Sequence, residues 1–151
     1  MSSNSTNKEQ GVFNARKSPG FYLYLGHKRY DGYLNRLLKE YNFNTSHWPM
    51  LNQIYLNEGV TQKELADLCE RNPSSIGKSV DIMEKNNWIE RRTNPEDRRI
   101  YNLFLTEKGR EVHKTIGQYA EKVRQKGTQG FTEDELNQLY SYIMRIMNNL
   151  E

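Results

Sequence analysis

The sequence predicts a mainly α-helical protein with a two-stranded β-ribbon near its middle. Two short helices between residues 61 and 86 are separated by a turn of three or four residues. Two short β-type segments joined by a polar tip follow these helices. On both sides of this stretch, apolar residues recur at the spacing of long helices. Helix, turn, helix and ribbon in this order form the plan of a winged helix-turn-helix domain.

The first 44 residues predict a polar arm followed by one long helix. Residues 1–17 are polar with a bias toward Ser, Asn and Thr, which predicts a flexible arm. Ser18 and Pro19 form a typical helix start, because a hydroxyl caps the helix and proline suits its first turn. The apolar stripe continues at helical spacing to Tyr41, and residues 42–44 break it.

Three shorter helices are predicted next. Thr45 or Ser46 caps the first, which ends at residues 58–59. Thr61 and Glu64 form a capping box for the second, because each satisfies a free N–H group of the other. Its expected inward residues are Leu65, Ala66, Leu68 and Cys69. Asn72 caps the third helix, for which the expected buried residues are Ile76, Val80 and Met83.

The last part of the chain predicts a hairpin and two more helices. Residues 88–92 and 99–105 are strand candidates, and residues 93–98 form the tip between them. Thr106 caps a long helix, and Thr132 with Glu135 forms a second capping box. The C-terminal helix that follows carries a nearly unbroken apolar stripe.

The composition and length predict a single globular domain. The chain has 151 residues, enough for one core, and its hydrophobic content of 35% is low. We therefore expect some helices to complete their cores against a second subunit. No run of 18 apolar residues exists, and the N-terminus lacks a secretory signal, so no membrane association is expected. The single cysteine, Cys69, fits a reducing cytoplasm.

The placement of charge, rather than its sum, favours DNA as a partner. The net charge is only +3, and residues 61–105 contain eight Lys or Arg and eight Asp or Glu. Four of these cations bracket the hairpin: Arg91, Arg92, Arg98 and Arg99. A basic hairpin beside a helix pair predicts a surface that contacts the phosphate backbone.

Four segments resemble the multiple-antibiotic-resistance regulator (MarR) family of transcription factors: TQKELADLC, SSIGKSVDIMEK, WIERR and PEDRRIYNLFLTEKG. The resemblance runs from about Phe21 to the C-terminus. It implies a triangular homodimer in which the first and last helices form the interface. The domain organisation that follows is a dimerisation helix at 18–44, a winged helix-turn-helix DNA-binding domain at 45–105 and dimerisation helices at 106–151.

The resemblance places DNA contacts on the third short helix and on the hairpin. Ser74, Ser75, Gly77 and Lys78 face away from the predicted core; serine can donate to phosphates or base edges, and lysine can reach guanine or a phosphate. Asp81 is expected to orient a neighbouring cation. In the hairpin, we expect Arg98 to enter a minor groove. Asp97 is expected to orient an arginine by a charge-assisted bond, with Arg99 as the structural partner.

Two residues depart from the family pattern. Asn87 stands where glycine is usual, and asparagine is the next-best residue for the left-handed conformation that ends a helix. Gly77 lies inside the recognition helix, at a cost of about 1 kcal/mol relative to alanine. Either it permits close approach to the DNA backbone or it is a tolerated surface glycine.

The family's effector pocket lies where the dimer helices meet the winged domain. By sequence location, the candidate lining residues are Tyr24, His27, Tyr30, Trp48 and Met50. An anionic phenolic ligand needs a nearby cation, and His27 or Arg29 could supply it. The alternative is that these aromatic residues belong to the core and the dimer interface.

Other chemistry has no support in the sequence. Cys69 occupies a position where the helix pattern requires a small apolar residue, and the family's peroxide-sensing cysteine lies elsewhere. No metal-binding spacing joins His27, His47 and His113, and no phosphate-binding glycine loop or nucleophile motif occurs. We expect no cofactor, no metal and no enzyme activity.

The sequence thus predicts a homodimeric regulator that binds an inverted-repeat operator in double-stranded DNA, more often a repressor than an activator, and responds to a small aromatic ligand. Two alternatives remain open. One is a constitutive DNA-binding protein without an effector. The other is a winged-helix module for protein–protein interaction, for which no steep salt dependence of DNA binding is expected.

Overall fold

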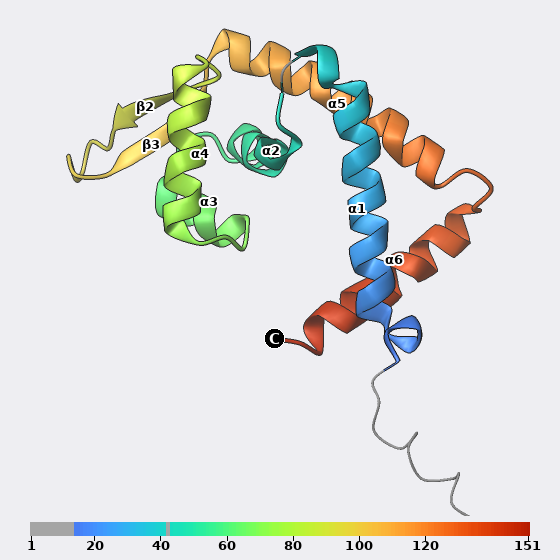
Figure 1. Cartoon of the computed structure of the whole chain (residues 1–151). Coiled ribbons are helices and arrows are strands. Elements are labelled where there is room, and N and C mark those ends of the chain that lie inside the picture. Colours follow the sequence, from blue (N-terminus) through green and yellow to red (C-terminus); the bar gives the residue numbers. More distant parts are fainter. Residues whose placement is uncertain (1–13, 42) are drawn as a thin grey trace, which may run out of the picture.

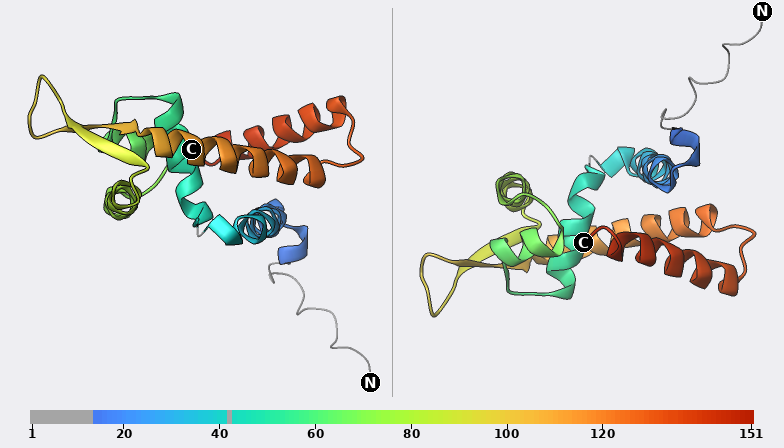
Figure 2. Two further views of the ribbon diagram at one scale, coloured as in Figure 1. Left: turned by 90° about the horizontal axis from the view of Figure 1, so that it is seen from above. Right: turned by 90° about the horizontal axis from the view of Figure 1, so that it is seen from below.

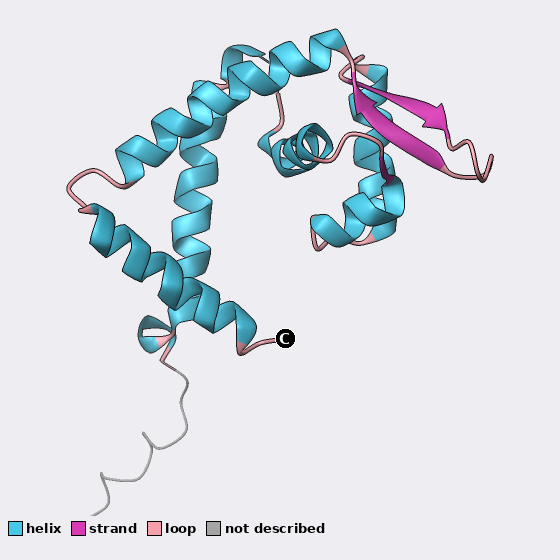
Figure 3. Ribbon diagram, turned by 180° about the vertical axis from the view of Figure 1, so that it is seen from behind, coloured by secondary structure: helices cyan, strands magenta, loops and turns pink. Residues whose placement is uncertain are grey.

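The computed structural model describes residues 14–41 and 43–151 and confirms the predicted mainly helical winged fold (Figures 1 and 3). The part of the arm predicted for residues 1–13 and the predicted break at Asn42 lie outside the described residues. Among the described residues, no helix combines the length and the apolar character that crossing a membrane requires. The helices in the described ranges are α1 (Pro19–Leu37), α2 (Trp48–Leu56), α3 (Gln62–Leu68), α4 (Pro73–Lys85), α5 (Glu107–Gly127) and α6 (Glu133–Asn148).

Three long helices form an open triangular frame beside a smaller domain (Figure 1). Helix α5 runs from the small domain to the far corner, α6 turns back from there, and α1 crosses between them. Figure 2 shows that α5 and α6 lie in one layer with α1 to one side. None of the sixteen residues of α6 is buried against the described part of the chain. The apolar stripe predicted for α6 therefore has no partner within the described chain.

The smaller domain contains α2, α3, α4 and an antiparallel sheet of strand order β1-β3-β2. The hairpin strands are β2 (Ile89–Thr93) and β3 (Tyr101–Leu105), with Arg91 opposite Leu103. The prediction of two strands was incomplete, because β1 (Val60–Thr61) pairs with β3 through Val60 and Leu103. A two-residue strand has no periodicity that a sequence pattern can reveal.

Side-chain caps start α3, α4, α5 and α6 as predicted, whereas the predicted cap of α1 is wrong, because the Ser18 hydroxyl makes no capping hydrogen bond. Thr61 and Glu64 form a complete capping box before α3, and Thr132 and Glu135 form one before α6. Thr106 Oγ1 accepts from Gly109 N at 3.0 Å at the start of α5. These caps satisfy N–H groups that would otherwise lack partners in the first turn. Glu64 accepts from the Thr61 backbone N–H and hydroxyl, and these hydrogen bonds lower the pKa of its carboxyl.

Several predicted boundaries differ in the structure. The first helix ends at Leu37, and a 3-10 helix at Lys39–Tyr41 follows. Another 3-10 helix, Ala15–Lys17, occupies the end of the predicted arm. Asn44, rather than Thr45 or Ser46, supplies a cap here: its Oδ1 accepts from Ser46 N at 2.9 Å at the start of a 3-10 helix, Thr45–His47. This 3-10 helix leads into α2, which has no side-chain cap of its own. Leu68, predicted to face inward, is 47% exposed.

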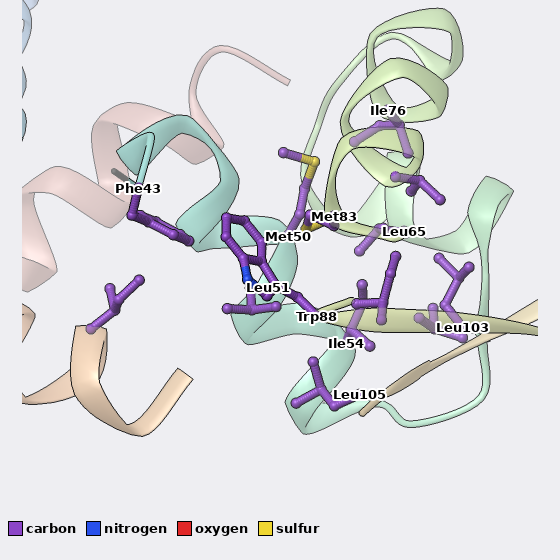
Figure 4. Packing of buried hydrophobic residues seen from close by; sticks show 14 of the residues in the cluster. Phe43, Met50, Leu51, Ile54, Leu65, Ile76, Met83, Trp88, Leu103 and Leu105 are labelled. Atoms are coloured by element: carbon purple, nitrogen blue, oxygen red, sulfur yellow. The ribbon is translucent and has the colours of Figure 1, made fainter. Parts of the chain in front are cut away.

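One continuous core joins the small domain to α5 and α1 (Figure 4). Its fully buried centre comes from three helices and two strands of the small domain: Met50, Leu51, Ile54, Leu65, Ile76, Val80, Met83, Ile89 and Leu103. Phe43 and Trp88 extend it toward α5, with ring centroids 5.1 Å apart. Burial of this apolar surface is the main force that holds α4 and the hairpin in place.

Candidate nucleic-acid interface

Helix α4 presents a short polar face beside the hairpin. Asn72 Oδ1 accepts from Ser74 N at 2.8 Å, so the helix begins where the Asn-Pro turn predicts. The buried face of α4 consists of Ile76, Val80 and Met83. The residues between them cannot face the same way, because side chains three and four apart share a helix face. Ser74, Ser75 and Lys78 are accordingly exposed, as the sequence predicted.

Gly77 is partly buried, and its nearest neighbour belongs to α3. A β-carbon at this position would lie 3.2 Å from Gln62 Nε2, the mobile end of a side chain. Gly77 therefore leaves room for the side chain of Gln62 to lie against α4. This explanation differs from both sequence interpretations, close approach to DNA and a tolerated surface glycine. Because the amide of Gln62 can shift, the space does not strictly require glycine.

The end of α4 has the conformation predicted from its sequence. Asn87 adopts φ +59°, the left-handed region that asparagine tolerates better than most residues. Its carbonyl oxygen accepts from Thr106 Oγ1 at 2.6 Å. Lys108 Nζ donates to the neighbouring carbonyl of Asn86 at 3.0 Å. The end of α4 is thus held against the start of α5.

The tip of the hairpin is organised by two side chains. Asn94 Oδ1 accepts from Glu96 N at 2.8 Å and from Asp97 N at 3.2 Å. Asp97 accepts two bonds from the guanidinium of Arg99, both at 3.1 Å. These hydrogen bonds lower the pKa of Asp97, so its carboxylate stays ionised. The pairing of Asp97 with Arg99 agrees with the expectation from the sequence.

Arg98 is exposed at the tip and forms no ion pair with any other described residue. Because Arg99 satisfies Asp97, the charge of Arg98 is not cancelled by its neighbour. At the tip, Arg99 is therefore held in a bidentate pair with Asp97, whereas Arg98 can reach an anion.

A cavity of about 390 Å³ lies between α1, the start of α2 and α5. Three of the predicted residues line it: His27, Tyr30 and Trp48. Tyr24 and Met50 do not, because Met50 is fully buried in the core and Tyr24 is exposed elsewhere on α1. One polar wall is fixed by Asp31, which accepts from Thr45 Oγ1 at 2.5 Å and Asn35 Nδ2 at 3.1 Å.

The cation of this cavity comes from the winged domain. Arg71, at the turn between α3 and α4, lines the cavity, and its Nη1 donates to the carbonyl oxygen of Ser46 at 3.3 Å. Arg29, named from the sequence as one source of positive charge, instead lines a separate hollow on α1. Sequence spacing could not reveal Arg71, which is 44 positions away from His27 and reaches the cavity only through the fold.

Cys69 and His113 lie in packed surroundings that favour a structural role. Cys69 is half-buried, and burial raises the pKa of its thiol, which disfavours the reactive thiolate. His113 stacks between Trp48 and Tyr55, with centroid distances of 5.1 and 4.0 Å. In the part of the chain that the structure describes, no group of three His, Cys, Asp or Glu side chains could hold a metal ion.

Comparison with protein families and known proteins gives consistent matches. The model of the MarR family matches residues 43–101. The HTH-type transcriptional regulator YdcH of Bacillus subtilis (strain 168) is 32% identical over 112 residues, covering 72% of this chain and 76% of YdcH. The HTH-type transcriptional repressor IacR of Pseudomonas putida is 24% identical over 139 residues, covering 92% of this chain and 83% of IacR.

A solved structure shares the same fold. A mutant of MarR from E. coli, in complex with operator DNA, matches with a TM-score of 0.82 at 22% identity. The match covers 89% of this chain and 97% of that chain. The winged domain and the long helices are therefore arranged alike in both proteins.

Proposed function

The chain belongs to the MarR family of transcriptional regulators, and from this premise we propose that it is a homodimeric repressor whose operator binding a small ligand relieves. As a family member it is a DNA-binding regulator of transcription and not an enzyme. We propose in addition that it acts in the cytoplasm, beside the chromosome. The relative IacR, named a repressor, supports the sign of regulation.

Two exposed elements, helix α4 and the hairpin, support the proposal that the protein binds DNA. Helix α4 and the hairpin lie side by side (Figure 1), and each presents an exposed cation, Lys78 and Arg98. A helix of this kind fits the major groove, and an arginine fits the narrower and more negative minor groove. Ser74 and Ser75 add short donors at the N-terminal end of α4, where its backbone N–H groups also favour phosphate.

The second copy in the proposal is supported by the exposed apolar side chains of the frame. On α6, Leu139, Tyr140, Tyr142, Met144 and Met147 are between 41% and 53% exposed. Tyr22 and Leu23, near the start of α1, are also exposed. A row of exposed apolar side chains on one helix is typical of subunit interfaces. A symmetric dimer would place its two α4 helices in successive major grooves, about 34 Å apart.

The ligand part of the proposal rests on the cavity beside Arg71. Its aromatic residues, Tyr30 and Trp48, suit a flat ring, and the guanidinium of Arg71 suits a carboxylate. Arg71 also precedes the cap of α4, so a ligand that draws it from Ser46 would act on the reading helix. Such a ligand regulates only if it binds the two dimer states with different affinities.

Selection of bound duplexes from a random DNA library tests the proposed function. The proposal predicts that the recovered sequences share an inverted repeat whose half-sites are about one helical turn apart. A single unpaired half-site would contradict the homodimer. The proposal that the protein binds DNA would be contradicted if no preferred sequence were recovered and if binding did not weaken as salt rises. That result would favour a protein-interaction module.

A further inference from the structure

Arg91 of β2 lies at the joint between the hairpin and the recognition helix. Its Nη2 donates to Asp81 Oδ1 at 2.6 Å, and its Nη1 donates to Glu84 Oε2. Both carboxylates belong to α4, so one guanidinium from the sheet bridges two turns of the helix. The side chain of Arg91 is 20% exposed, whereas that of Asp81 is 68% exposed.

The surroundings hold Arg91 as a fixed cation. Burial lowers its pKa, but the hydrogen bonds and negative charges of Asp81 and Glu84 raise the pKa overall. A bidentate, partly desolvated pair is stronger and better oriented than a solvated surface pair. The geometry therefore joins β2 to α4 at a defined angle and leaves little freedom for the two to move apart.

The two carboxylates also present an electrostatic problem. Asp81 and Glu84 are the only acidic residues of α4; Asp81 is exposed and Glu84 is partly buried. If α4 approaches DNA, two uncompensated negative charges near the phosphates would oppose binding. Arg91 carries one positive charge, so from its place at the joint it offsets one of these two negative charges.

We propose that Arg91 is a positioning residue for DNA binding, which sets the angle between the recognition helix and the wing and offsets one of the two negative charges of Asp81 and Glu84. This inference rests on the proposed function, because it assumes that α4 and the wing contact DNA together. Arg91 acts through its two partners and is not itself a DNA contact. Its effect on affinity should therefore depend on whether those partners are present.

Arg92 offers a matched control on the same strand. Its side chain points to the opposite face of the sheet, because successive residues alternate. Its guanidinium pairs with Glu90 and lies over the ring of Phe104, 4.2 Å from the centroid. Arg92 thus has the same charge and nearly the same place in the chain, but no link to α4.

The test is a double-mutant cycle on operator affinity. Arg91→Met should weaken binding about tenfold in the wild-type background, within the range for residues of one ion-pair network. In a background carrying Asp81→Asn and Glu84→Gln, the same change should alter affinity less than about twofold. Arg92→Met should have the same effect in both backgrounds. Thermal unfolding of each variant confirms that the folded protein is compared.

The salt dependence separates positioning from direct contact. Removal of a direct phosphate contact lowers the slope of log affinity against log salt by about 0.9. We expect Arg91→Met to leave this slope unchanged in the Asp81→Asn, Glu84→Gln background. A fall of about 0.9, an equal loss of affinity in both backgrounds, or a loss of thermal stability with unchanged affinity would each overturn the inference.

A conservative variant keeps the test available if Arg91→Met does not fold. Arg91→Lys retains the charge but can pair well with only one carboxylate, so it should recover part of the affinity and depend on Asp81 and Glu84 in the same way. If the wild-type protein bound no duplex, the proposed function would fail. If it bound normally and the cycle were additive, only the role of Arg91 would fail.

Discussion

The α-carbon of Gly109 lies so close to Trp88 that a β-carbon there would be 1.8 Å from the Trp88 carbonyl oxygen. The Trp88 carbonyl is a backbone group, and a β-carbon is bonded directly to the backbone, so neither can turn aside. Trp88 O also accepts from Thr106 N at 3.1 Å. The start of α5 is therefore packed directly against the backbone that connects α4 to β2. This contact joins α4 and the hairpin closely to the long helix α5.

Gly109→Ala should therefore destabilise the protein. Alanine gains about 1 kcal/mol over glycine within a helix, but forcing a side chain into closely packed backbone costs about 1–3 kcal/mol or more, so the overlap dominates. Gly117→Ala on the same helix is the control, because its β-carbon would lie 3.7 Å from Trp48, an ordinary contact. Urea unfolding should rank the variants Gly117→Ala, wild type, Gly109→Ala in falling stability. Equal stability of both variants would refute the close packing.

Arg98→Ala should weaken operator binding by about tenfold or more and leave the fold and dimer unchanged. The exposed Arg98 forms no ion pair within the described chain, so its loss removes one phosphate or groove contact and lowers the salt slope by about 0.9. Arg99→Ala is the comparison, since Arg99 is engaged by Asp97. We expect a smaller change of slope for it. Fluorescence anisotropy at several salt concentrations measures both, and an unchanged affinity for Arg98→Ala would remove it from the interface.

The two capping boxes, the cap at Asn72 and the left-handed Asn87 were all predictable, because each depends on residues within a few positions of one another. The exposure of Ser74, Ser75 and Lys78 follows from helical periodicity. The contacts of Gly109 and Arg71 were not predictable, because each joins segments that only the fold brings together. The apolar stripe of α6 was predicted from its spacing, yet the described part of one chain does not bury it.

Arg71→Gln should abolish the response to aromatic carboxylates. If the guanidinium of Arg71 binds the carboxylate, wild-type protein should show a higher melting temperature and weaker operator binding in the presence of such an acid. Arg29→Gln is the matched control, because Arg29 lies outside the cavity on α1. Thermal-shift and gel-shift titrations with a panel of phenolic acids measure both responses. If no member of the panel affects the wild type, the protein is better described as a constitutive DNA-binding regulator.

Stability should fall as the medium becomes acidic. Burial lowers the pKa of His113 and of His47, so the folded protein holds both rings neutral more strongly than the unfolded chain does. Below a pH of about 6.5 the unfolded chain binds protons first, so the stability contributed by the neutral rings is lost from there down to the folded pKa values.

His113→Gln removes one of these titrating groups and keeps a donor for Asn52 Oδ1, which lies 3.0 Å from His113 Nε2. Urea unfolding between pH 7.5 and 5.5 should show a shallower loss of stability in this variant than in the wild type. The opposite order, or a wild type that gains stability on acidification, would contradict the assignment of neutral buried rings.

We expect two copies of the chain to hold their two winged domains on one operator. Sedimentation equilibrium measures this directly, on the free protein and on its complex with a single selected duplex. We expect the free protein to have twice the mass of one 17.9 kDa chain, and the complex to contain two chains per duplex. A free protein of 17.9 kDa, or one chain bound per duplex, would contradict the claim.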